Sequence, residues 1–180
     1  EFLANIFERR GAEDYLGEPV TVAEHMLQGA WLAEQEKAPE ELVVAALLHD
    51  IGHFTSEFGT YSPDDTQDRH HDEAGGDILA PFFPEVVTDC VRLHVAAKRY
   101  LCATDDTYFS KLSPASVHTL SLQGGPMSKD EIAAFESNPH FREAVQVRIW
   151  DEGGKVPGMK TKSFRDYVPL LQRVVDRHLS

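Results

Sequence analysis

A histidine–aspartate pair stands at the end of a long apolar stretch. The stretch closes with Ala45-Ala-Leu-Leu and is followed by His49-Asp50-Ile-Gly-His53. Neighbouring residues on a helix are rotated by about 100°, so His49 and Asp50 cannot both face the core from one regular helix, whereas His49 and His53 share a face. The pattern predicts a helix end that bends around a bound group. The alternative is a capped helix end with a hydrogen-bonded histidine.

Other side chains with ligand atoms are expected to point inward from different helices. The six inward candidates are His25, the pair His49-Asp50, His71, His94 and Asp151. Four imidazoles and two carboxylates are too many polar groups to bury without partners. Mixed nitrogen and oxygen donors suit iron, manganese or zinc better than calcium or magnesium alone. Six ligands exceed what one catalytic metal keeps while leaving room for substrate, so the set predicts two metals, with Asp50 as the natural bridge.

The choice between two adjacent histidines rests on helix faces. His71 shares a face with the apolar Ala74 and Ile78. His70 instead aligns with Ala74 and Asp77. His71 is therefore the expected ligand and His70 the solvated residue, although spacing alone does not decide between them. For the whole set, the alternative is a group of separate core or surface residues, each hydrogen-bonded on its own.

The elements that position these residues are predicted to be helices. Apolar residues recur at helical spacing, two capping boxes start helices at Thr21 and Ser128, and no stretch alternates as a strand does. The predicted helices cover residues 2–10, 22–35, 40–50, 70–79, 85–98 or 85–100, 116–122, 129–137, 141–151 and 164–179. Residues 54–69 are expected to form a long loop, which is typical of a functional or mobile segment. The predicted fold class is all-α.

Composition limits the class of protein. With 180 residues, the chain is expected to form one domain over residues 1–180. It has 17 basic and 30 acidic residues and a net charge of −13, which argues against a nucleic-acid partner. Two cysteines do not make a disulfide framework, so a cytoplasmic location is expected. No apolar run reaches the roughly 18 residues of a membrane span, and neither a membrane nor an obligate protein partner is predicted.

In their order along the chain, the six candidates resemble the pattern of the HD-domain superfamily, H…HD…H…H…D on a bundle of helices. Most members of that superfamily are metal-dependent phosphohydrolases. A smaller branch uses a mixed-valent di-iron centre to activate dioxygen and includes phosphonate-cleaving oxygenases. The chain resembles this branch more specifically, over nearly its whole length. The motifs that carry the resemblance are Asp14-Tyr15-Leu-Gly-Glu18, Glu24-His25, Leu47-Leu-His49-Asp50-Ile-Gly-His53, His94-Val-Ala-Ala-Lys98-Arg-Tyr-Leu101, Gln123-Gly-Gly-Pro-Met127 and Arg148-Ile-Trp-Asp151-Glu.

The resemblance implies an HD-domain helical bundle that holds two iron ions in a mixed-valent Fe(II)/Fe(III) state. One iron would be held by His25, His49, Asp50 and Asp151. The other would be held by His71, His94 and the shared Asp50. Tyr15 matches a tyrosine that occupies the open position of the second iron at rest and leaves when substrate binds.

The same resemblance implies the substrate contacts. Glu18 matches a carboxylate that meets the cationic nitrogen of the substrate. The groups around the phosphonate would be His53, Lys98, Ser116 and Arg148, with Thr119 and Gln123 near that region. The residues with implied catalytic roles are Tyr15, Glu18, His53 and Lys98.

The residues themselves agree with a phosphonate site. A phosphonate dianion needs charged donors held in place. Lys98 lies one helical turn after His94, and Arg148 lies three residues before Asp151, so both cations project beside ligand candidates. The alternative for Lys98 is a solvated helix-end cation that the helix dipole favours.

The reaction implied by the resemblance is O2-dependent cleavage of the carbon–phosphorus bond of (R)-1-hydroxy-2-(trimethylammonio)ethylphosphonate, giving glycine betaine and phosphate. A trimethylammonium group needs a larger pocket with electrostatic or cation–π contact. The loop between His53 and His71, with Phe54, Phe58, Tyr61 and several aspartates, is expected to form it. The same reaction on 2-amino-1-hydroxyethylphosphonate, giving glycine, is the first alternative. A metal-dependent phosphohydrolase and a metal-dependent binding module are more distant ones.

Overall fold

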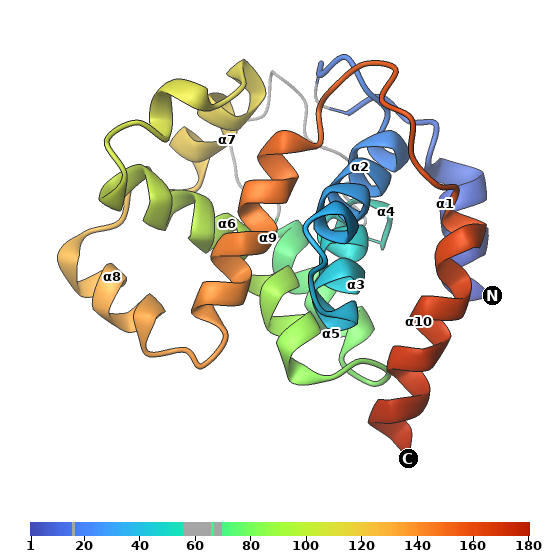
Figure 1. Ribbon diagram of the computed structural model, residues 1–180. Coiled ribbons are helices and arrows are strands. Elements are labelled where there is room, and N and C mark those ends of the chain that lie inside the picture. The colour runs from blue at the N-terminus through green and yellow to red at the C-terminus, as the bar shows by residue number, and fades with distance from the viewer. Residues whose placement is uncertain (16, 56–65, 67–69) are drawn as a thin grey trace.

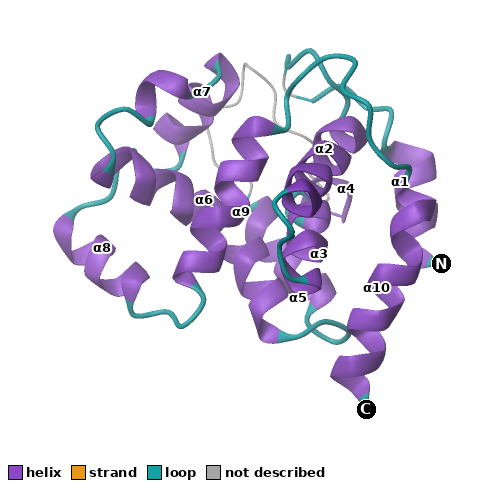
Figure 2. Ribbon diagram, viewed as in Figure 1, coloured by secondary structure: helices purple, strands orange, loops and turns teal. Residues whose placement is uncertain are grey.

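The described part of the chain consists of helices joined by loops (Figure 2). This computed structural model describes residues 1–15, 17–55, 66 and 70–180. The elements in order are α1 (Phe2–Arg10), α2 (Val22–Gln35), α3 (Glu40–Leu48), α4 (Gly52–Thr55), α5 (His71–Leu79), α6 (Glu85–Thr104), the 3-10 turn η1 (Phe109–Lys111), α7 (Pro114–Leu122), α8 (Lys129–Glu136), α9 (Phe141–Gly153) and α10 (Phe164–Leu179). Within these residues there is no strand, and the predicted all-α class is confirmed.

Helix α3 is the buried centre of the molecule. Its residues from Val43 to Leu48 are at most 2% exposed, as expected for a helix that is apolar on every side. It packs against α2, α6, α9 and α10, while α6 also packs against α5 and α9. In Figure 1, α1 and α10 lie on one side of this bundle, and α7 and α8 lie on the other. The bundle brings segments far apart in sequence to the end of α3.

The chain bends at the end of α3, as the sequence predicts. The helix ends at Leu48 rather than at the expected Asp50, because the next amides form tighter turns. The amide of Ile51 donates to the carbonyl of Leu48, and the amide of His53 donates to the carbonyl of Asp50, both at 3.0 Å. The short α4 follows and includes the first two residues, 54 and 55, of the segment that was expected to form a long loop. Most of that predicted loop, including Phe58 and Tyr61, lies outside the described residues.

Gly52 allows α4 and α5 to touch through their backbones. A Cβ atom added at Gly52 would lie 1.8 Å from the carbonyl oxygen of His71, so a larger residue does not fit without moving one of the two segments. This approach stacks the rings of His53 and His71, whose centroids are 4.1 Å apart. The glycine between Asp50 and His53 therefore serves to bring two histidines together.

Both predicted capping boxes are present. The amide of Glu24 donates to Thr21 Oγ1 at 3.2 Å and the amide of Thr21 donates to Glu24 Oε2 at 2.8 Å. Ser128 and Glu131 form the same pair of hydrogen bonds at the start of α8. Local chemistry therefore sets where these helices begin.

Helix α6 continues to Thr104, beyond the expected end at residue 98 or 100. Its last turns pack against the loop before α8 and against α8 itself. Arg99 Nε donates to the carbonyl of Gly125 at 2.8 Å, and the ring of Tyr100 lies 5.0 Å from that of Phe135. These tertiary contacts explain the longer helix.

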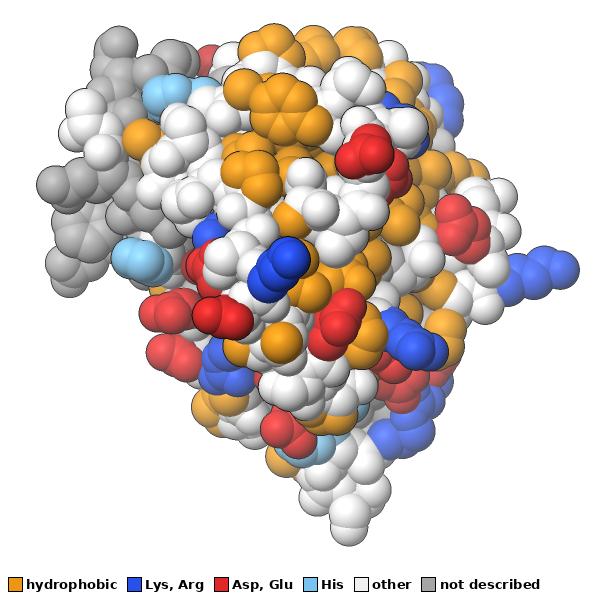
Figure 3. Space-filling model, turned by 90° about the vertical axis from the view of Figure 1, so that its left-hand side faces the viewer, with side chains coloured by type: hydrophobic (Ala, Val, Ile, Leu, Met, Phe, Trp, Pro, Cys, Tyr) orange, Lys and Arg blue, Asp and Glu red, His pale blue; other side chains and the backbone are white. Residues whose placement is uncertain are grey.

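The surface of the molecule matches its mixed charge. The face shown in Figure 3 carries acidic and basic side chains that are interspersed around an apolar area. Among the residues that the structure describes, no helix is both long enough and apolar enough to cross a membrane.

Candidate active site

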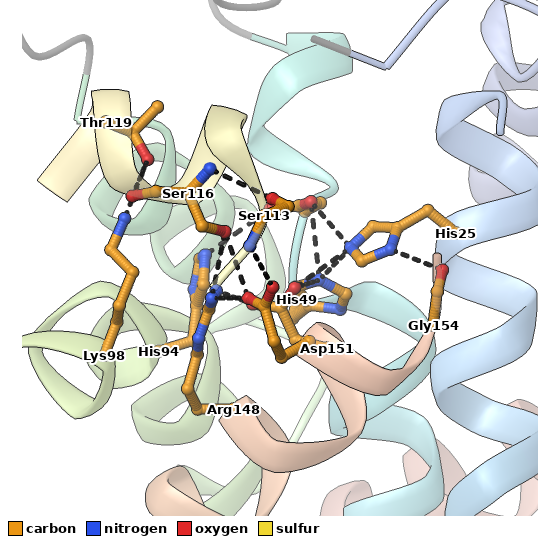
Figure 4. Close-up of polar contacts among 12 residues, drawn as sticks. His25, His49, His94, Lys98, Ser113, Ser116, Thr119, Arg148, Asp151 and Gly154 are labelled. Atoms are coloured by element: carbon orange, nitrogen blue, oxygen red, sulfur yellow. Dashed lines mark hydrogen bonds and ion pairs between the residues drawn. The ribbon is translucent and has the colours of Figure 1, made fainter. Parts of the chain in front are cut away.

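Two groups of buried ligand atoms meet at the end of α3. The first group is His25, His49 and Asp151, and the second is Asp50, His71 and His94. In each group the ligand atoms lie within 4.8 Å of one another. The residues come from α2, the turn after α3, α5, α6 and α9, and His25, Asp151 and His94 are seen converging in Figure 4. Each group has a composition and spacing that can hold a metal ion.

Asp50 lies between the two groups and faces both. Its Oδ2 atom is 3.4 Å from Nε2 of His25 and 3.4 Å from Nε2 of His49. Its Oδ1 atom is 3.3 Å from Nε2 of His71 and 3.4 Å from Nε2 of His94. Asp50 Oδ2 and Asp151 Oδ1 are buried and accept no hydrogen bond from the described residues. Buried carboxylate oxygens in that state need a cation nearby, and one that faces two ligand groups has the geometry of a bridge.

Backbone carbonyls orient three of the imidazoles. Nδ1 lies 2.9 Å from the carbonyl of Gly154 in His25, 2.8 Å from that of Ala46 in His49, and 2.7 Å from that of Val91 in His94. A carbonyl only accepts, so each Nδ1 carries a proton and donates it. Each Nε2 therefore points at the carboxylates, which is the arrangement that metal-binding histidines show.

The two carboxylates remain ionised despite their burial. Burial alone would raise the pKa of Asp50, but the imidazoles of His49, His53 and His25 lower it well below its ordinary value. For Asp151, burial acts the same way, and Arg148 and His49 lower the pKa well below its ordinary value. Both carboxylates are therefore negatively charged at neutral pH.

The histidines split into two electrostatic classes. Burial lowers the pKa of His53 and His94 below the ordinary value, so both are neutral at pH 7. In His49 the carboxylates of Asp50 and Asp151 outweigh burial and raise the pKa to about 10. The proton on His49 balances negative charge that a metal ion would also balance, so metal binding there would release a proton.

Tyr15 covers the site from the loop before α2. Its ring stacks on His25 with centroids 4.3 Å apart and meets His53 edge-on at 6.2 Å. Burial first, and then the charges of Asp50 and Asp151, raise the pKa of the phenol well above its ordinary value. A neutral, buried hydroxyl therefore lies beside the Asp50 carboxylate.

A pocket opens beside the second ligand group. It is lined by Tyr15, by Glu18 and by the six residues expected around the phosphonate, which are His53, Lys98, Ser116, Thr119, Gln123 and Arg148, together with Asp50, His71, His94, Asp151, Val95, Ala115 and Lys155. His70 is exposed, whereas His71 joins the second ligand group. The predicted contacts to the phosphonate and four of the six ligand candidates thus line one space, while His25 and His49 lie in the first ligand group next to it. Phe54 was expected to help form the pocket for the trimethylammonium group but does not line this pocket, because its ring packs against Phe7 with centroids 5.8 Å apart. The roles of the pocket residues as ligands and substrate contacts stay predictions.

Lys98 and Arg148 lie on neighbouring helices in Figure 4, but their partners differ. Lys98 is 3% exposed; its Nζ donates to Thr119 Oγ1 at 2.8 Å, and it forms no ion pair with a carboxylate of the described residues. Arg148 makes four hydrogen bonds to described residues with its five N–H donors. It donates to Asp151, to Glu152, to Ser116 Oγ at 3.2 Å and, through Nε, to the hydroxyl of Tyr108 at 2.8 Å. Within the described residues, Lys98 therefore keeps two N–H donors for a ligand and Arg148 keeps one.

Sequence reasoning missed several residues of this network. Lys155 Nζ lies 3.3 Å from Glu18 Oε1, Ser113 Oγ donates to the same oxygen, and Tyr108 holds Arg148. Glu152 falls inside the quoted motif around Asp151 but received no role. For Lys155, Ser113 and Tyr108 no local pattern gives a signal, because their partners are distant in sequence.

Comparison with known proteins agrees with this geometry. Residues 22–115 match the model of the HD domain, and the chain belongs to the HD-domain family. It is 61% identical over 179 residues to (1-hydroxy-2-(trimethylamino)ethyl)phosphonate dioxygenase (glycine-betaine-forming) of Leisingera caerulea, an alignment that covers 99% of this chain and 91% of that protein. It is 44% identical over 170 residues to hydroxymethylphosphonate dioxygenase of Gimesia maris, with 93% and 85% covered. The expected resemblance to the phosphonate-cleaving branch is confirmed.

Proposed function

We propose that this protein is a di-iron oxygenase that cleaves the carbon–phosphorus bond of 1-hydroxy-2-(trimethylammonio)ethylphosphonate with O2, giving glycine betaine and phosphate. The identity of 61% over nearly the whole chain with an enzyme named for this reaction supports the substrate. One structural observation carries the proposal. The Asp50 carboxylate lies between two groups of buried histidines, 3.3–3.4 Å from both, at the wall of a pocket that presents a cation and a separate carboxylate.

The charges of the pocket suit a zwitterion. Lys98 is a buried cation without a carboxylate partner among the described residues, so an anionic phosphonate would compensate it. Among the described residues, Glu18 pairs with one cation, Lys155, which also pairs with Glu152, so a cationic nitrogen would complete the charge balance of Glu18. A substrate with a phosphonate at one end and an ammonium at the other meets both needs at once.

The donor set fits iron. His25, His49, Asp151 and Asp50 would hold one iron, and His71, His94 and Asp50 the other, since borderline metals take imidazole and carboxylate ligands. When bound, the irons supply the activation of dioxygen, for which side chains have no equivalent. We assign the mixed-valent Fe(II)/Fe(III) state to the pair on the same resemblance.

The remaining residues bind and orient the substrate. Lys98, His53, Ser116, Arg148 and Gln123 are assigned to the phosphonate, and Glu18 to the cation. The side-chain oxygen of Gln123 is buried and accepts no hydrogen bond from the described residues, so it is available to a hydroxyl group. Tyr15 stays protonated because its pKa is raised, and we assign it to covering the centre until the substrate displaces it. Together these groups hold the carbon that bears the hydroxyl and phosphorus next to the metals and exclude water.

We further propose that residues 1–180 form one HD domain. The matched residues 22–115 end before α9. Asp151 and Arg148 of α9 nevertheless lie in the same ligand groups and pocket as residues of α2 and α6. The site would be incomplete without them.

The test is to measure oxygen uptake and phosphate release by protein loaded anaerobically with iron. The trimethylated phosphonate, its primary-amine analogue and hydroxymethylphosphonate are supplied separately. We expect the trimethylated compound to be preferred and to give one phosphate and one glycine betaine for each O2 consumed. That ratio follows because the two oxygen atoms balance the conversion of the substrate to a carboxylate and phosphate without another reductant.

Each other outcome rejects a specific part of the proposal. Coupled uptake and release with the primary amine alone would keep the reaction and change the substrate. Hydrolysis of a phosphate ester without oxygen uptake would make the protein a phosphohydrolase. Tight binding of the phosphonate without any turnover would make it a binding module.

Lys98 gives the reaction a predicted pH dependence. Burial, and then the nearby Arg148 and Lys155, lower the pKa of Lys98 to about 7. A phosphonate dianion binds the protonated lysine and raises its pKa, so binding takes up a proton above pH 7. We expect kcat/KM to be highest below the pKa of the free protein and to fall by up to about tenfold per pH unit above it.

The control for this prediction is substitution of the same lysine. Lys98→Met should lower kcat/KM and remove the fall above pH 7, whereas Lys98→Arg should retain the charge and move the fall to higher pH, because a guanidinium stays protonated. An unchanged alkaline limb in Lys98→Met would assign the fall to another group.

A further inference from the structure

Lys155, which is not among the predicted site residues, forms an ion pair with Glu18, the carboxylate assigned to the substrate cation. Lys155 Nζ lies 3.3 Å from Glu18 Oε1 and 3.4 Å from Glu152 Oε2, and the side chain is 9% exposed. It also donates to Ser113 Oγ at 3.1 Å and to Ser116 Oγ at 2.9 Å. The ammonium of Lys155 is therefore surrounded by oxygen atoms and lines the pocket.

The backbone holds Lys155 firmly in this position. The residue follows the end of α9, where the amide of Gly154 donates to the carbonyl of Asp151 at 3.0 Å. On the other side, the amide of Val156 donates to Gln28 Oε1 at 2.9 Å and the carbonyl of Val156 accepts from Gln28 Nε2 at 2.8 Å. Gln28 is 2% exposed on α2. Lys155 is thus fixed between two helices that also carry ligand candidates.

Both contacts to Glu18 fall on the same oxygen. Ser113 Oγ donates to Oε1, and Lys155 approaches Oε1 as well. Among the described residues no donor reaches Oε2, so this is the oxygen that Glu18 keeps for a ligand. The nearby carboxylate of Glu152 is already bound by Arg148 and Lys155. The pocket therefore offers much negative charge but few free acceptors at this end.

Primary and quaternary ammonium groups respond differently to that arrangement. A primary ammonium has three N–H donors, and each donor that is buried without an acceptor costs binding free energy. A trimethylammonium has no N–H and needs only charge and apolar contact, for which Val95 and Ala115 line the pocket. The charge of Glu18 serves both groups, but its free lone pairs serve only the primary amine.

We propose that Lys155, with Ser113, determines the specificity for a quaternary ammonium by occupying Glu18 Oε1. This inference rests on the proposed function, because it assigns the substrate cation to Glu18. Lys155 itself acts through Glu18 and is a positioning residue. Removing the Ser113 hydroxyl or the Lys155 ammonium returns a lone pair of Glu18 Oε1 to the pocket, which only the N–H groups of a primary ammonium can use. Loss of the Lys155 charge favours both substrate cations, so the ratio between the two substrates reports the lone pair.

The experiment compares kcat/KM for the trimethylated phosphonate and for its primary-amine analogue in iron-loaded wild type, Lys155→Met and Ser113→Ala. In both variants the ratio of primary to trimethylated substrate should rise by about tenfold, the effect of one hydrogen bond to a charged group. The ratio of the anaerobically measured dissociation constants, primary over trimethylated, should fall correspondingly. Lys162→Met is the matched control, since Lys162 pairs with Glu34 at a position that is 44% exposed and does not line the pocket.

The two variants keep the test decisive. Ser113→Ala removes one hydroxyl and reports on Oε1 even where loss of Lys155 prevents folding. A ratio that stays at the wild-type value, or falls, in a folded variant overturns the inference. Failure of the proposed function is a separate result, because the wild type would then consume no O2 with either phosphonate.

Discussion

Replacing Asp50 with alanine is expected to remove both metal ions and to reduce phosphonate turnover to below about 1% of the wild-type rate. The two oxygens of Asp50 face different histidine pairs, His25 with His49 and His71 with His94, at 3.3–3.4 Å. Loss of a shared ligand therefore weakens two sites at once. The measurements are iron content per chain after anaerobic loading and gel filtration, and the rate of phosphate release.

Asp77→Ala is the matched control for this substitution. Asp77 lies on α5 and its side chain is 75% exposed in an ion pair with Arg92, so its loss should leave metal content and turnover near the wild-type values. Circular dichroism of each variant separates loss of metal from loss of fold. An Asp50→Ala protein that kept two irons and the wild-type rate would contradict the assignment of Asp50 as a bridge.

The second large effect is expected from Arg148→Met. Arg148 is 4% exposed and donates to Asp151, Glu152, Ser116 and Tyr108. Removing it leaves buried carboxylates without their main cation, which costs about 3–5 kcal/mol. For a chain of this size we expect Tm to fall by roughly 6–20 °C, together with loss of phosphonate binding. Thermal unfolding followed by circular dichroism and titration with the phosphonate measure the two effects.

Two further variants compare the loss of Arg148 with the loss of an exposed ion pair and with the loss of a single hydrogen bond. Arg173→Met breaks an ion pair with Glu40 in which Arg173 is 54% exposed, so Tm should change by less than about 4 °C. Tyr108→Phe removes one hydrogen bond to Arg148 and should cost about 1 kcal/mol. If Arg148→Met were as stable as the wild type, the carboxylates would have other partners that compensate them.

Features set by nearby residues could be predicted from the sequence. The capping boxes at Thr21 and Ser128 form as expected, because each needs only a residue and its neighbour three positions later. The apolar run before His49 is buried because a helix without a polar face has no side that is stable in contact with water. The bend at His49-Asp50 follows from the rotation between adjacent residues, which no straight helix can reconcile with two inward side chains.

Other features depend on distant residues and emerged only in three dimensions. Helix α6 continues to Thr104 because α8 packs against its last turns. The approach of α4 to α5 at Gly52 joins His71, not the exposed His70, to Asp50 and His94. The sequence spacing favoured His71 over His70 as the ligand but did not decide between them, since both lie near the start of one helix.

The chemistry of the pocket shows the same division. The residue types of His25, His49-Asp50, His71, His94 and Asp151 and their order identify a metal-binding set, because few other arrangements justify so many polar groups at inward positions. The pairing of Lys155 and Ser113 with Glu18 has no counterpart in local sequence, since the partners lie on three separate segments. Sequence alone therefore determined the helical class and the types of the candidate ligands. Tertiary packing decided which oxygen faces which histidine and which carboxylate atoms are left for a substrate.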